Sequence, residues 1–272
     1  MVELHCGAAT DTGLVRATNQ DAFLAAAPVF VVADGMGGHA GGEVASGIVI
    51  EEFTRMVLDG YDETRALEVV TEVLAESQRR IRAYADRHRG AGDPDWYSGT
   101  TVVAALLCHD DEGSKWLLVN LGDSRIYRLH EGALEQVSVD HSVVQELVDS
   151  GEIEAASAAT HPDRHVVTRA LGGPGLVQPD FFVLPLGSAT RVVLCSDGVS
   201  GMIGDAEIRR ILAEAPDPRD AADRMVGAAL AAGGEDNATA VVVEVVGLTG
   251  TERPEEGRRS QVSLEEKLGA LP

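Results

Sequence analysis

The sequence predicts an α+β protein whose core is built from antiparallel strands and covered by helices. Apolar, strand-like runs at 100–108 and 115–121 are joined by a short polar turn at 110–113. Such short connections imply antiparallel pairing, because parallel strands need long crossovers. The stretches 43–58 and 62–88 instead carry apolar residues at near-helical spacing, which is typical of helices that cover a sheet face.

The other predicted elements follow in chain order. An apolar run broken by Pro28 predicts a hairpin over 21–34, and the glycine-rich stretch 35–42 predicts a flexible loop. Further strands and helices are expected at 125–129, 191–196, 205–215, 218–232 and 238–246. Asp205 and Asp217 are suitable N-caps for the last two helices, with Pro218 at a first helical position.

The length and composition indicate one large globular domain. The chain has 272 residues, of which 44% are hydrophobic, enough for a well-buried core. We expect residues 1–246 to form this domain, with a surface element inserted at about 140–175. The polar stretch 247–272 is expected to be a flexible tail with a short helix around 264–268.

Charge and cysteine content narrow the possible partners and compartment. The formal charge of −22 disfavours nucleic acids and anionic membranes, which are attracted mainly by Lys and Arg. Three cysteines are an odd number and suggest a reducing compartment. Because no basic leader with an apolar stretch and no run of about 18 apolar residues is present, we expect a soluble, cytoplasmic protein.

Five aspartates stand where predicted strands begin or end. Asp34, Asp123 and Asp197 follow apolar runs, whereas Asp21 and Asp236 precede them. In an antiparallel sheet the end of one strand lies beside the start of its neighbour, so these acids can meet at one edge. Carboxylates within about 4–6 Å repel one another unless cations neutralise them. The sequence therefore predicts a metal site.

The ligand chemistry favours hard divalent cations. Oxygen ligands select Mg²⁺ or Mn²⁺, whereas zinc and copper sites usually recruit Cys or His, and neither accompanies these acids at ligand spacing. Two such ions about 3.5–4 Å apart can activate a water for in-line attack on a phosphate ester. Arg16 could bind the phosphate oxygens, and the unhindered carbonyl of Gly35 could add a metal ligand.

Six short motifs carry a resemblance to a known family. Together they resemble the ordered motifs of the PPM family, the metal-dependent (type 2C) protein serine/threonine phosphatases, over about residues 5–246. The motifs are Arg16-Ala17-Thr18-Asn19-Gln20-Asp21, Ala33-Asp34-Gly35-Met36-Gly37-Gly38, Ser98-Gly99-Thr100-Thr101, Gly122-Asp123-Ser124-Arg125, Ser196-Asp197-Gly198 and Asp236-Asn237-Ala238-Thr239.

The resemblance implies a fold and a set of site residues. The fold would be a four-layer α-β-β-α sandwich, with two antiparallel sheets packed face to face and a centre for two Mg²⁺ or Mn²⁺ ions at one end. Stretch 140–175 resembles the flap of bacterial members. The implied roles are metal bridging for Asp34, a carbonyl ligand from Gly35, further ligands Asp197 and Asp236, a third-metal position at Asp123 with Asp197, a water-mediated role for Asp21, and phosphate binding by Arg16.

The sequence departs from the family pattern at two positions. Many eukaryotic members carry a histidine, proposed as general acid, where this chain has Met36. A thioether cannot donate a proton, so the leaving oxygen must be protonated by water or by another residue. Gln20 stands where some members have an acidic residue, which weakens a contact to water. Neither change removes an expected metal ligand.

The implied function is hydrolysis of phosphoserine and phosphothreonine in proteins, which would reverse Ser/Thr kinase signalling. Expected partners are phosphorylated proteins, including such kinases, and a monomer is favoured. One alternative is a pseudophosphatase that binds phosphoproteins without turnover, and another is an enzyme dedicated to one small regulator. Stretch 35–40 also satisfies a loose dinucleotide-binding pattern, but Asp34 would then press a negative charge toward the pyrophosphate.

Overall fold

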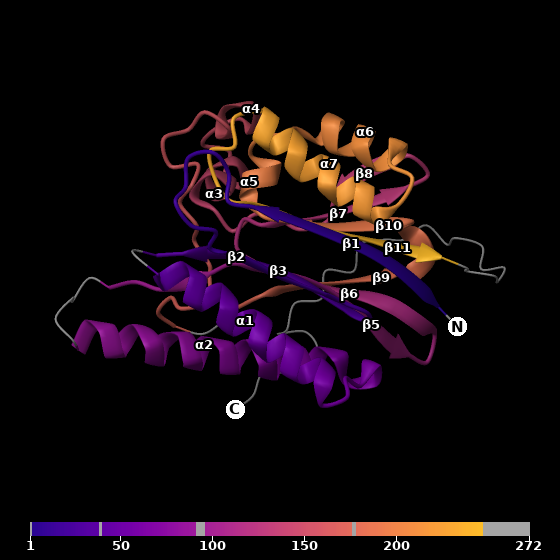
Figure 1. Cartoon of the computed structure of the whole chain (residues 1–272), viewed down its shortest axis with the longest axis horizontal. Helices are drawn as coiled ribbons and strands as arrows, with labels where there is room; N and C mark the ends of the chain where they lie inside the picture. Colours follow the sequence, from indigo (N-terminus) through magenta and orange to yellow (C-terminus); the bar gives the residue numbers. More distant parts are fainter. Residues whose placement is uncertain (1, 38–39, 91–95, 176–177, 247–272) are drawn as a thin grey trace.

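Two antiparallel sheets pack face to face and are covered by helices on both outer sides (Figure 1). The structure is a computed structural model and describes residues 2–37, 40–90, 96–175 and 178–246. The tail expected at 247–272 lies outside the described residues. The α-β-β-α sandwich is confirmed, and its layers follow from where the apolar side chains point.

The first sheet has the strand order β1-β11-β10-β7-β8. All neighbouring pairs are antiparallel, and β1 pairs with β11 along its full length, from Glu3 opposite Val246 to Asp11 opposite Ala238. The strands are β1 (Glu3–Asp11), β7 (Arg125–His130), β8 (Ala133–Gln136), β10 (Arg191–Cys195) and β11 (Ala238–Val246).

The second sheet has the order β2-β3-β5-β6-β9, and a short strand, β4, pairs with the end of β3. The β2–β3 hairpin is confirmed; it turns at Pro28, which follows a cis peptide bond. The strands are β2 (Asp21–Ala26), β3 (Val29–Met36), β4 (Gly99–Thr100), β5 (Val102–Asp110), β6 (Gly113–Leu121) and β9 (Asp180–Pro185).

Alternating side chains of each sheet form three apolar layers. Phe30, Leu118 and Leu194 meet between the sheets, whereas Val31 and Val193 point to the outer faces. This alternation is the period of a β-strand. The outer face of the second sheet is covered by α1 (Gly41–Leu58) and α2 (Ala66–Gly90), which follows the 3-10 turn η1 (Glu63–Arg65). The first sheet is covered by α6 (Asp205–Glu214) and α7 (Pro218–Ala231).

The remaining helical pieces are short. They are α3 (Val143–Asp149), α4 (Ala155–Ala158), α5 (Asp197–Ser200) and the 3-10 turn η2 (Leu186–Ser188). Helices α3, α4 and α5 gather at one end of the sandwich (Figure 1). In the described parts of the chain, no helix combines the length and the apolar character needed to cross a bilayer.

Two details differ from the sequence-based expectations. Asp217 caps α7 by accepting a hydrogen bond from Asp220 N, as predicted, but Asp205 is not the N-cap of α6. Gly204 holds that position, and the Asp205 carboxylate instead accepts a hydrogen bond from the Tyr127 hydroxyl at 3.2 Å. No strand was predicted from the sequence at β8 or β9, which lie at the ends of the two sheets.

Candidate metal centre

The five aspartates are brought to one end of the sandwich by strands of both sheets. Asp34 lies near the end of β3, and its register partner on β2 is Asp21. The other three lie in the turn after β6, just after β10 and just before β11, as Asp123, Asp197 and Asp236. Because β11 packs against β2 and β3 of the opposite sheet, acids from both sheets face one another.

The backbone of Asp34 is fixed on both sides of its side chain. Its carbonyl oxygen accepts hydrogen bonds from Thr101 N at 2.9 Å and from the Thr100 hydroxyl at 2.8 Å. Its own N–H donates to the Thr101 hydroxyl at 3.1 Å. The Thr100-Thr101 pair therefore holds the strand end in one conformation and sets the direction of the carboxylate.

Gly35 leaves no room for a side chain. A Cβ at this position would lie 2.3 Å from Gly42 O and 2.5 Å from Gln20 O. The N–H of Gly35 also donates to Gln20 O at 3.2 Å. The start of α1 can therefore approach β3 closely, and the Gly35 backbone lines the same cavity as the acids.

Asp21 connects the two sheets. The Ser196 hydroxyl donates to Asp21 Oδ2 at 2.8 Å, and Ser196 Oγ in turn accepts from Thr239 N at 3.0 Å. The other carboxylate oxygen, Oδ1, is buried and has no hydrogen-bond partner among the described residues. Burial raises the pKa of Asp21 to about 7, and repulsion from the Asp197 and Asp236 carboxylates adds to the rise.

Two more carboxyl groups have a pKa that is raised in the same way. Burial, followed by repulsion from Asp21, Asp197 and Asp123, holds the pKa of Asp34 well above its ordinary value. Burial also raises the pKa of Asp123 to about 7, with further repulsion from Asp197 and Asp140. Negative charge is therefore unfavourable at this edge unless a cation compensates for it.

Arg16 and Asp236 are paired with each other. Arg16 Nη2 donates to Asp236 Oδ2 at 2.6 Å, and the arginine side chain remains 57% exposed. The neighbouring Asn237, for which the sequence predicted no individual role, holds the surrounding loops together: its amide donates to Thr12 O and Thr18 O, both at 2.9 Å. A phosphate that binds Arg16 must therefore compete with Asp236.

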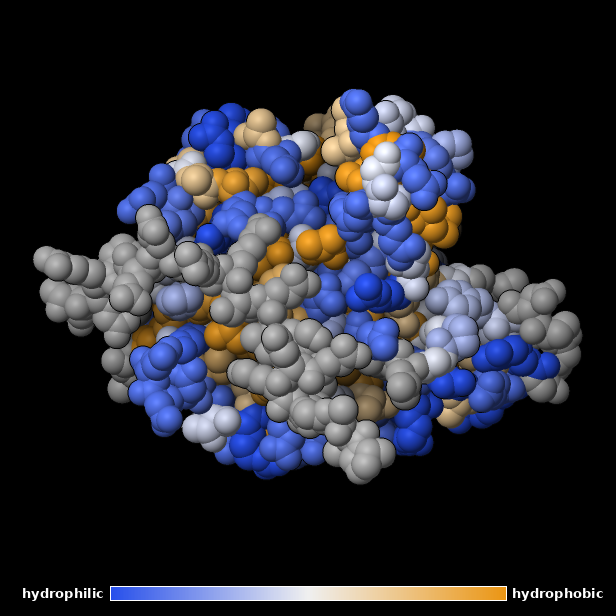
Figure 2. All heavy atoms as spheres, turned by 180° about the vertical axis from the view of Figure 1, so that it is seen from behind, coloured by the Kyte–Doolittle hydropathy of each residue, from blue (hydrophilic) through white to orange (hydrophobic). Residues whose placement is uncertain are grey.

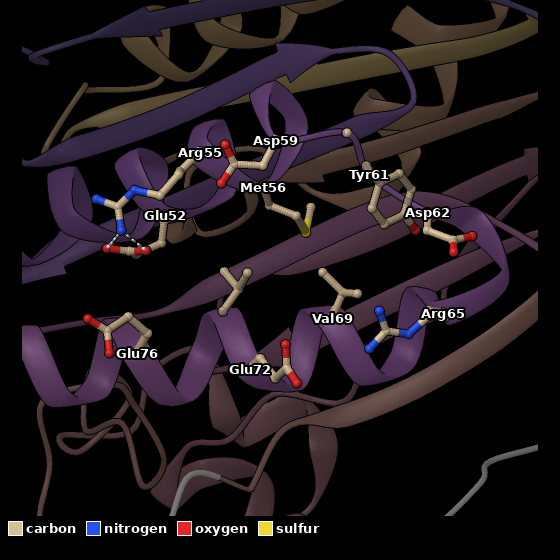
Figure 3. A pocket seen from close by; sticks show the side chains of 12 residues that line it. Glu52, Arg55, Met56, Asp59, Tyr61, Asp62, Arg65, Val69, Glu72 and Glu76 are labelled. Carbon is tan, nitrogen blue, oxygen red and sulfur yellow. Dashed lines mark hydrogen bonds and ion pairs between the residues drawn. The ribbon is translucent and has the colours of Figure 1, made fainter.

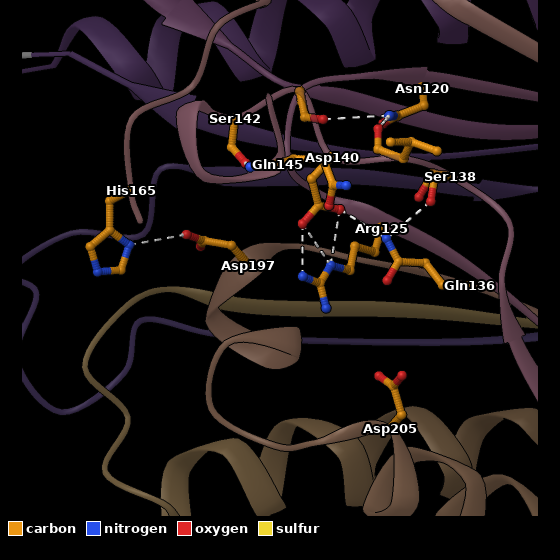
Figure 4. A network of polar contacts seen from close by, with 12 residues as sticks. Asn120, Arg125, Gln136, Ser138, Asp140, Ser142, Gln145, His165, Asp197 and Asp205 are labelled. Atoms are coloured by element: carbon orange, nitrogen blue, oxygen red, sulfur yellow. Dashed lines mark hydrogen bonds and ion pairs between the residues drawn. The ribbon is translucent and has the colours of Figure 1, made fainter. Parts of the chain in front are cut away.

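A cavity of about 1070 Å³ opens over the acids. Arg16, Asp34, Asp123, Asp197 and Asp236 line it, as do residues of stretch 140–175. From that stretch His165 Nδ1 comes within 3.9 Å of Asp197 Oδ2 (Figure 4). The His165 side chain is 64% exposed, and it lies at the cavity.

The start of stretch 140–175, Asp140 and His141, is here called its root and is held by a network of charged and polar side chains (Figure 4). Arg125 donates through Nε and Nη2 to the Asp140 carboxylate at 2.7–3.0 Å, and the Gln136 amide donates to Asp140 Oδ1 at 2.9 Å. The following residue, His141, accepts a hydrogen bond from Gly122 N at 3.1 Å through Nδ1. These bonds connect the stretch to the turn that carries Asp123.

A second hollow lies between the end of α1 and the start of α2 (Figure 3) and has a volume of about 310 Å³. Several of its charged groups are paired within the molecule: Glu52 accepts from Arg55 and Arg80, and Arg65 pairs with Glu68. None of the five aspartates lines it. The large cavity is therefore the better candidate for the site.

The residues at the acidic end fit divalent cations in chemistry. They supply carboxylate oxygens with raised pKa values and one buried carboxylate oxygen that lacks a partner, and hard cations are bound by such oxygens. Within the described ranges, however, no three His, Cys, Asp or Glu side chains already form a cage that could hold a metal ion. The individual ligand assignments therefore stay predictions.

Comparison with known proteins gives a consistent result. Residues 15–233 match the family model described as protein phosphatase 2C. The chain is 35% identical over 253 residues to the serine/threonine phosphatase Stp of Listeria innocua, covering 89% of this chain and 96% of the relative. It is 39% identical over 246 residues to the serine/threonine protein phosphatase PstP of Mycobacterium tuberculosis, covering 89% of this chain and 45% of that protein.

The same agreement extends to solved structures. The fold superimposes on the catalytic domain of a serine/threonine protein phosphatase PstP in complex with two manganese ions, with a TM-score of 0.77 and 35% identity. That comparison covers 91% of this chain and 100% of the other.

Proposed function

Because the chain belongs to the protein phosphatase 2C family of metal-dependent serine/threonine phosphatases, we propose that the acidic end of its sandwich is the catalytic centre. The enzyme removes phosphate from proteins at a dinuclear metal centre that uses manganese or magnesium. The observation that supports this location best is the set of mutually repelling carboxylates with raised pKa values beneath the large cavity.

We assign the ligands as follows. Asp34, the Gly35 carbonyl and the Asp197 and Asp236 carboxylates would hold two ions, and Asp123 with Asp197 would hold a third. The ions supply neutralising charge and an activated water when they are bound. Asp21 acts through water, supported by its buried, unpartnered oxygen and its hydrogen bond from Ser196.

Arg16 is assigned to the substrate phosphate. Its guanidinium is exposed at the rim of the cavity and now donates to Asp236. A phosphate offers the same acceptor geometry as a carboxylate, so it replaces Asp236 as partner when the substrate binds. Met36 is half-buried and lines the cavity, but its thioether cannot donate a proton. The leaving oxygen therefore takes its proton from water or from another cavity residue.

Hydrolysis of a phosphothreonine peptide during a manganese titration tests this proposal. We expect phosphate release that requires Mn²⁺, stops with EDTA and is lost in Asp197→Asn. Asp110→Asn is the matched control, because Asp110 is an exposed carboxylate at the end of β5 and pairs with Lys115. Peptide binding without phosphate release would instead support the pseudophosphatase alternative.

Stretch 140–175 is proposed to act as a flap beside the cavity. Its root is fixed by Arg125, and Thr168 N donates to His141 O at 2.8 Å, so motion is expected between these anchors. Hydrogen exchange that is faster in 150–165 than in the root would support a flap. Uniformly slow exchange throughout the stretch would contradict it.

The cellular context follows from the substrate class. Phosphorylated Ser/Thr kinases of the same regulatory circuit are the proposed physiological substrates, and a monomer in the cytoplasm is the proposed state. Light scattering after size exclusion measures the mass directly. A particle of twice the 28.6 kDa chain mass would overturn the monomer assignment.

A further inference from the structure

Two exposed apolar side chains stand directly before the proposed phosphate-binding arginine. Leu14 is 72% exposed and Val15 is 69% exposed, and Arg16 follows them in the chain. Single exposed apolar residues need no explanation, and hydrophobic patches are also visible among the hydrophilic ones in Figure 2. The pair is different because of how its backbone is held and what it adjoins.

The loop that carries this pair is fixed to the neighbouring loop. Gly13 has φ +80°, and a Cβ there would lie 2.3 Å from Asp236 O, so only glycine fits this close approach. Gly13 N donates to Asp11 Oδ1 at 2.9 Å, and Leu14 N donates to Gly234 O at 2.7 Å. The two side chains are therefore presented to solvent on an ordered backbone.

The apolar surface continues toward the cavity. A Cβ added at Gly234 would lie 3.0 Å from Leu14 Cγ and 3.2 Å from Leu230 Cδ2, so these two side chains are neighbours at Gly234. Met202 packs against Gly233, because its Cε would lie 3.1 Å from a Cβ added there. Met202 also lines the cavity. Leu14, Leu230 and Met202 therefore surround the Gly233-Gly234 pair, and we call these three side chains the apolar strip.

We propose that Leu14 and Val15 bind an apolar side chain of the substrate that lies within three residues of the phosphorylated Ser or Thr. The inference rests on the proposed function, because it takes the phosphate to be held at Arg16. An extended peptide advances about 3.3 Å per residue, and the Cα atoms of Val15 and Arg16 are about 3.8 Å apart. When Arg16 holds the phosphate, substrate residues within three positions of the phosphorylated residue are therefore within reach of Leu14 and Val15.

The charges around the cavity disfavour one class of neighbouring residue. Glu235 and Asp236 follow Gly234 in the chain and line the cavity, so they repel acidic residues beside the phosphate. An apolar side chain avoids that repulsion and removes two exposed apolar groups from water. Because the backbone is already ordered, little conformational entropy is lost on binding. One apolar contact of this size changes specificity by about tenfold.

Paired substrates and a matched surface variant test the proposal. The probes are phosphothreonine nonapeptides that carry either Leu or Ser at each position within three residues of the phosphothreonine, together with p-nitrophenyl phosphate, which has no flanking residues. The variants are L14S/V15S and, as the matched control, L58S. Leu58 is 80% exposed at the end of α1 and lies outside both the strip and the cavity lining.

The expected result is a preference of about tenfold in kcat/KM for the best Leu peptide over its Ser counterpart. This preference should fall below about twofold in L14S/V15S and persist in L58S, while the activity of L14S/V15S on p-nitrophenyl phosphate stays near that of the unmodified enzyme. A preference that survives in L14S/V15S, or no preference in the unmodified enzyme, would overturn the inference. Loss of manganese-dependent hydrolysis of every substrate in the unmodified enzyme would instead overturn the proposed function.

Discussion

The same strands carry buried apolar side chains along their length and acidic side chains at one end, and the two regions affect stability in opposite ways. Within β3, β6 and β10, Phe30, Leu118 and Leu194 are fully buried among apolar neighbours between the sheets. At or just beyond the ends of the same strands stand Asp34, Asp123 and Asp197, whose negative charges repel one another. The middle is stabilised by burial of apolar area, whereas the end is destabilised by burial of charge.

The difference assigns separate tasks to the two regions. The apolar middle stabilises the sandwich without any ligand and fixes where each strand ends. The acidic end uses that rigidity to hold carboxylates closer together than they would settle by themselves. Substitutions at the ends should therefore change activity and cation binding, and substitutions in the middle should change the free energy of unfolding.

The largest effect is expected for Asp34→Asn, which preserves shape but removes charge. If Asp34 bridges the ions, the rate of phosphopeptide hydrolysis should fall by at least about 10³-fold, equivalent to about 4 kcal/mol. Steady-state assays with excess Mn²⁺ measure the effect, and circular dichroism should show that the fold is retained. Activity within tenfold of the unmodified enzyme would remove Asp34 from the centre.

The apolar middle should respond in stability. Leu118→Ala deletes a fully buried side chain between the sheets and should lower the free energy of unfolding by about 2–5 kcal/mol. Urea denaturation measures the loss. The matched control, Leu58→Ala, removes the same atoms at a position that is 80% exposed and should change stability by less than about 0.5 kcal/mol.

Cation binding should stabilise the acidic end. At 100 times its dissociation constant, Mn²⁺ should raise the free energy of unfolding by about 2.7 kcal/mol per site. Thermal melts with increasing Mn²⁺ measure this gain. Asp34→Asn should lose most of it, whereas Leu118→Ala should keep it despite its lower starting stability; equal gains in both variants would contradict the separation of tasks.

The smallest predicted effect is a dependence on pH in metal-free protein. Because the pKa of Asp123 is raised to about 7, the folded chain holds a proton between pH 4 and 7 that the unfolded chain has lost. Stability should therefore be highest near pH 4 for this group and fall as pH rises toward 7. Asp123→Asn removes this loss, so its stability relative to the unmodified protein should rise by about 2.5 kcal/mol between pH 5 and 7.5.

Urea melts in EDTA across this range provide the measurement. A difference between Asp123→Asn and the unmodified protein that stays constant with pH would mean that the carboxylate is not held at a raised pKa. Repeating the melts with Mn²⁺ should cancel the dependence, because a bound cation stabilises the charged form.

The sequence was sufficient for the parts of the fold that rest on local patterns. The turn at 110–113 predicted an antiparallel pair, and Pro28 with the acids around it predicted the hairpin in which Asp21 faces Asp34. Strand β9 was missed because its run Phe181-Phe182-Val183-Leu184 follows the glycine cluster at 172–175, which is typical of a loop. Prolines on both sides of that run, at 179 and 185, were the available signal.

The hydrogen bonds and ion pairs of the site could not be predicted from local sequence patterns. Ser196 reaches Asp21 from 175 residues away, and Arg16 reaches Asp236 across 220 residues. A serine or arginine has no local pattern that selects such a partner, because the partner depends on how the two sheets meet. Tertiary structure was likewise required to bring His165 and Met202 to the cavity.

The central claim is that carboxylates from the ends of strands in two sheets converge on divalent cations. Anomalous diffraction from crystals grown with Mn²⁺ tests it most directly. We expect two strong peaks that share Asp34 as a ligand, with Asp197 and Asp236 also bonded. Peaks confined to surface carboxylates elsewhere, with Asp34 bonded to none, would contradict it.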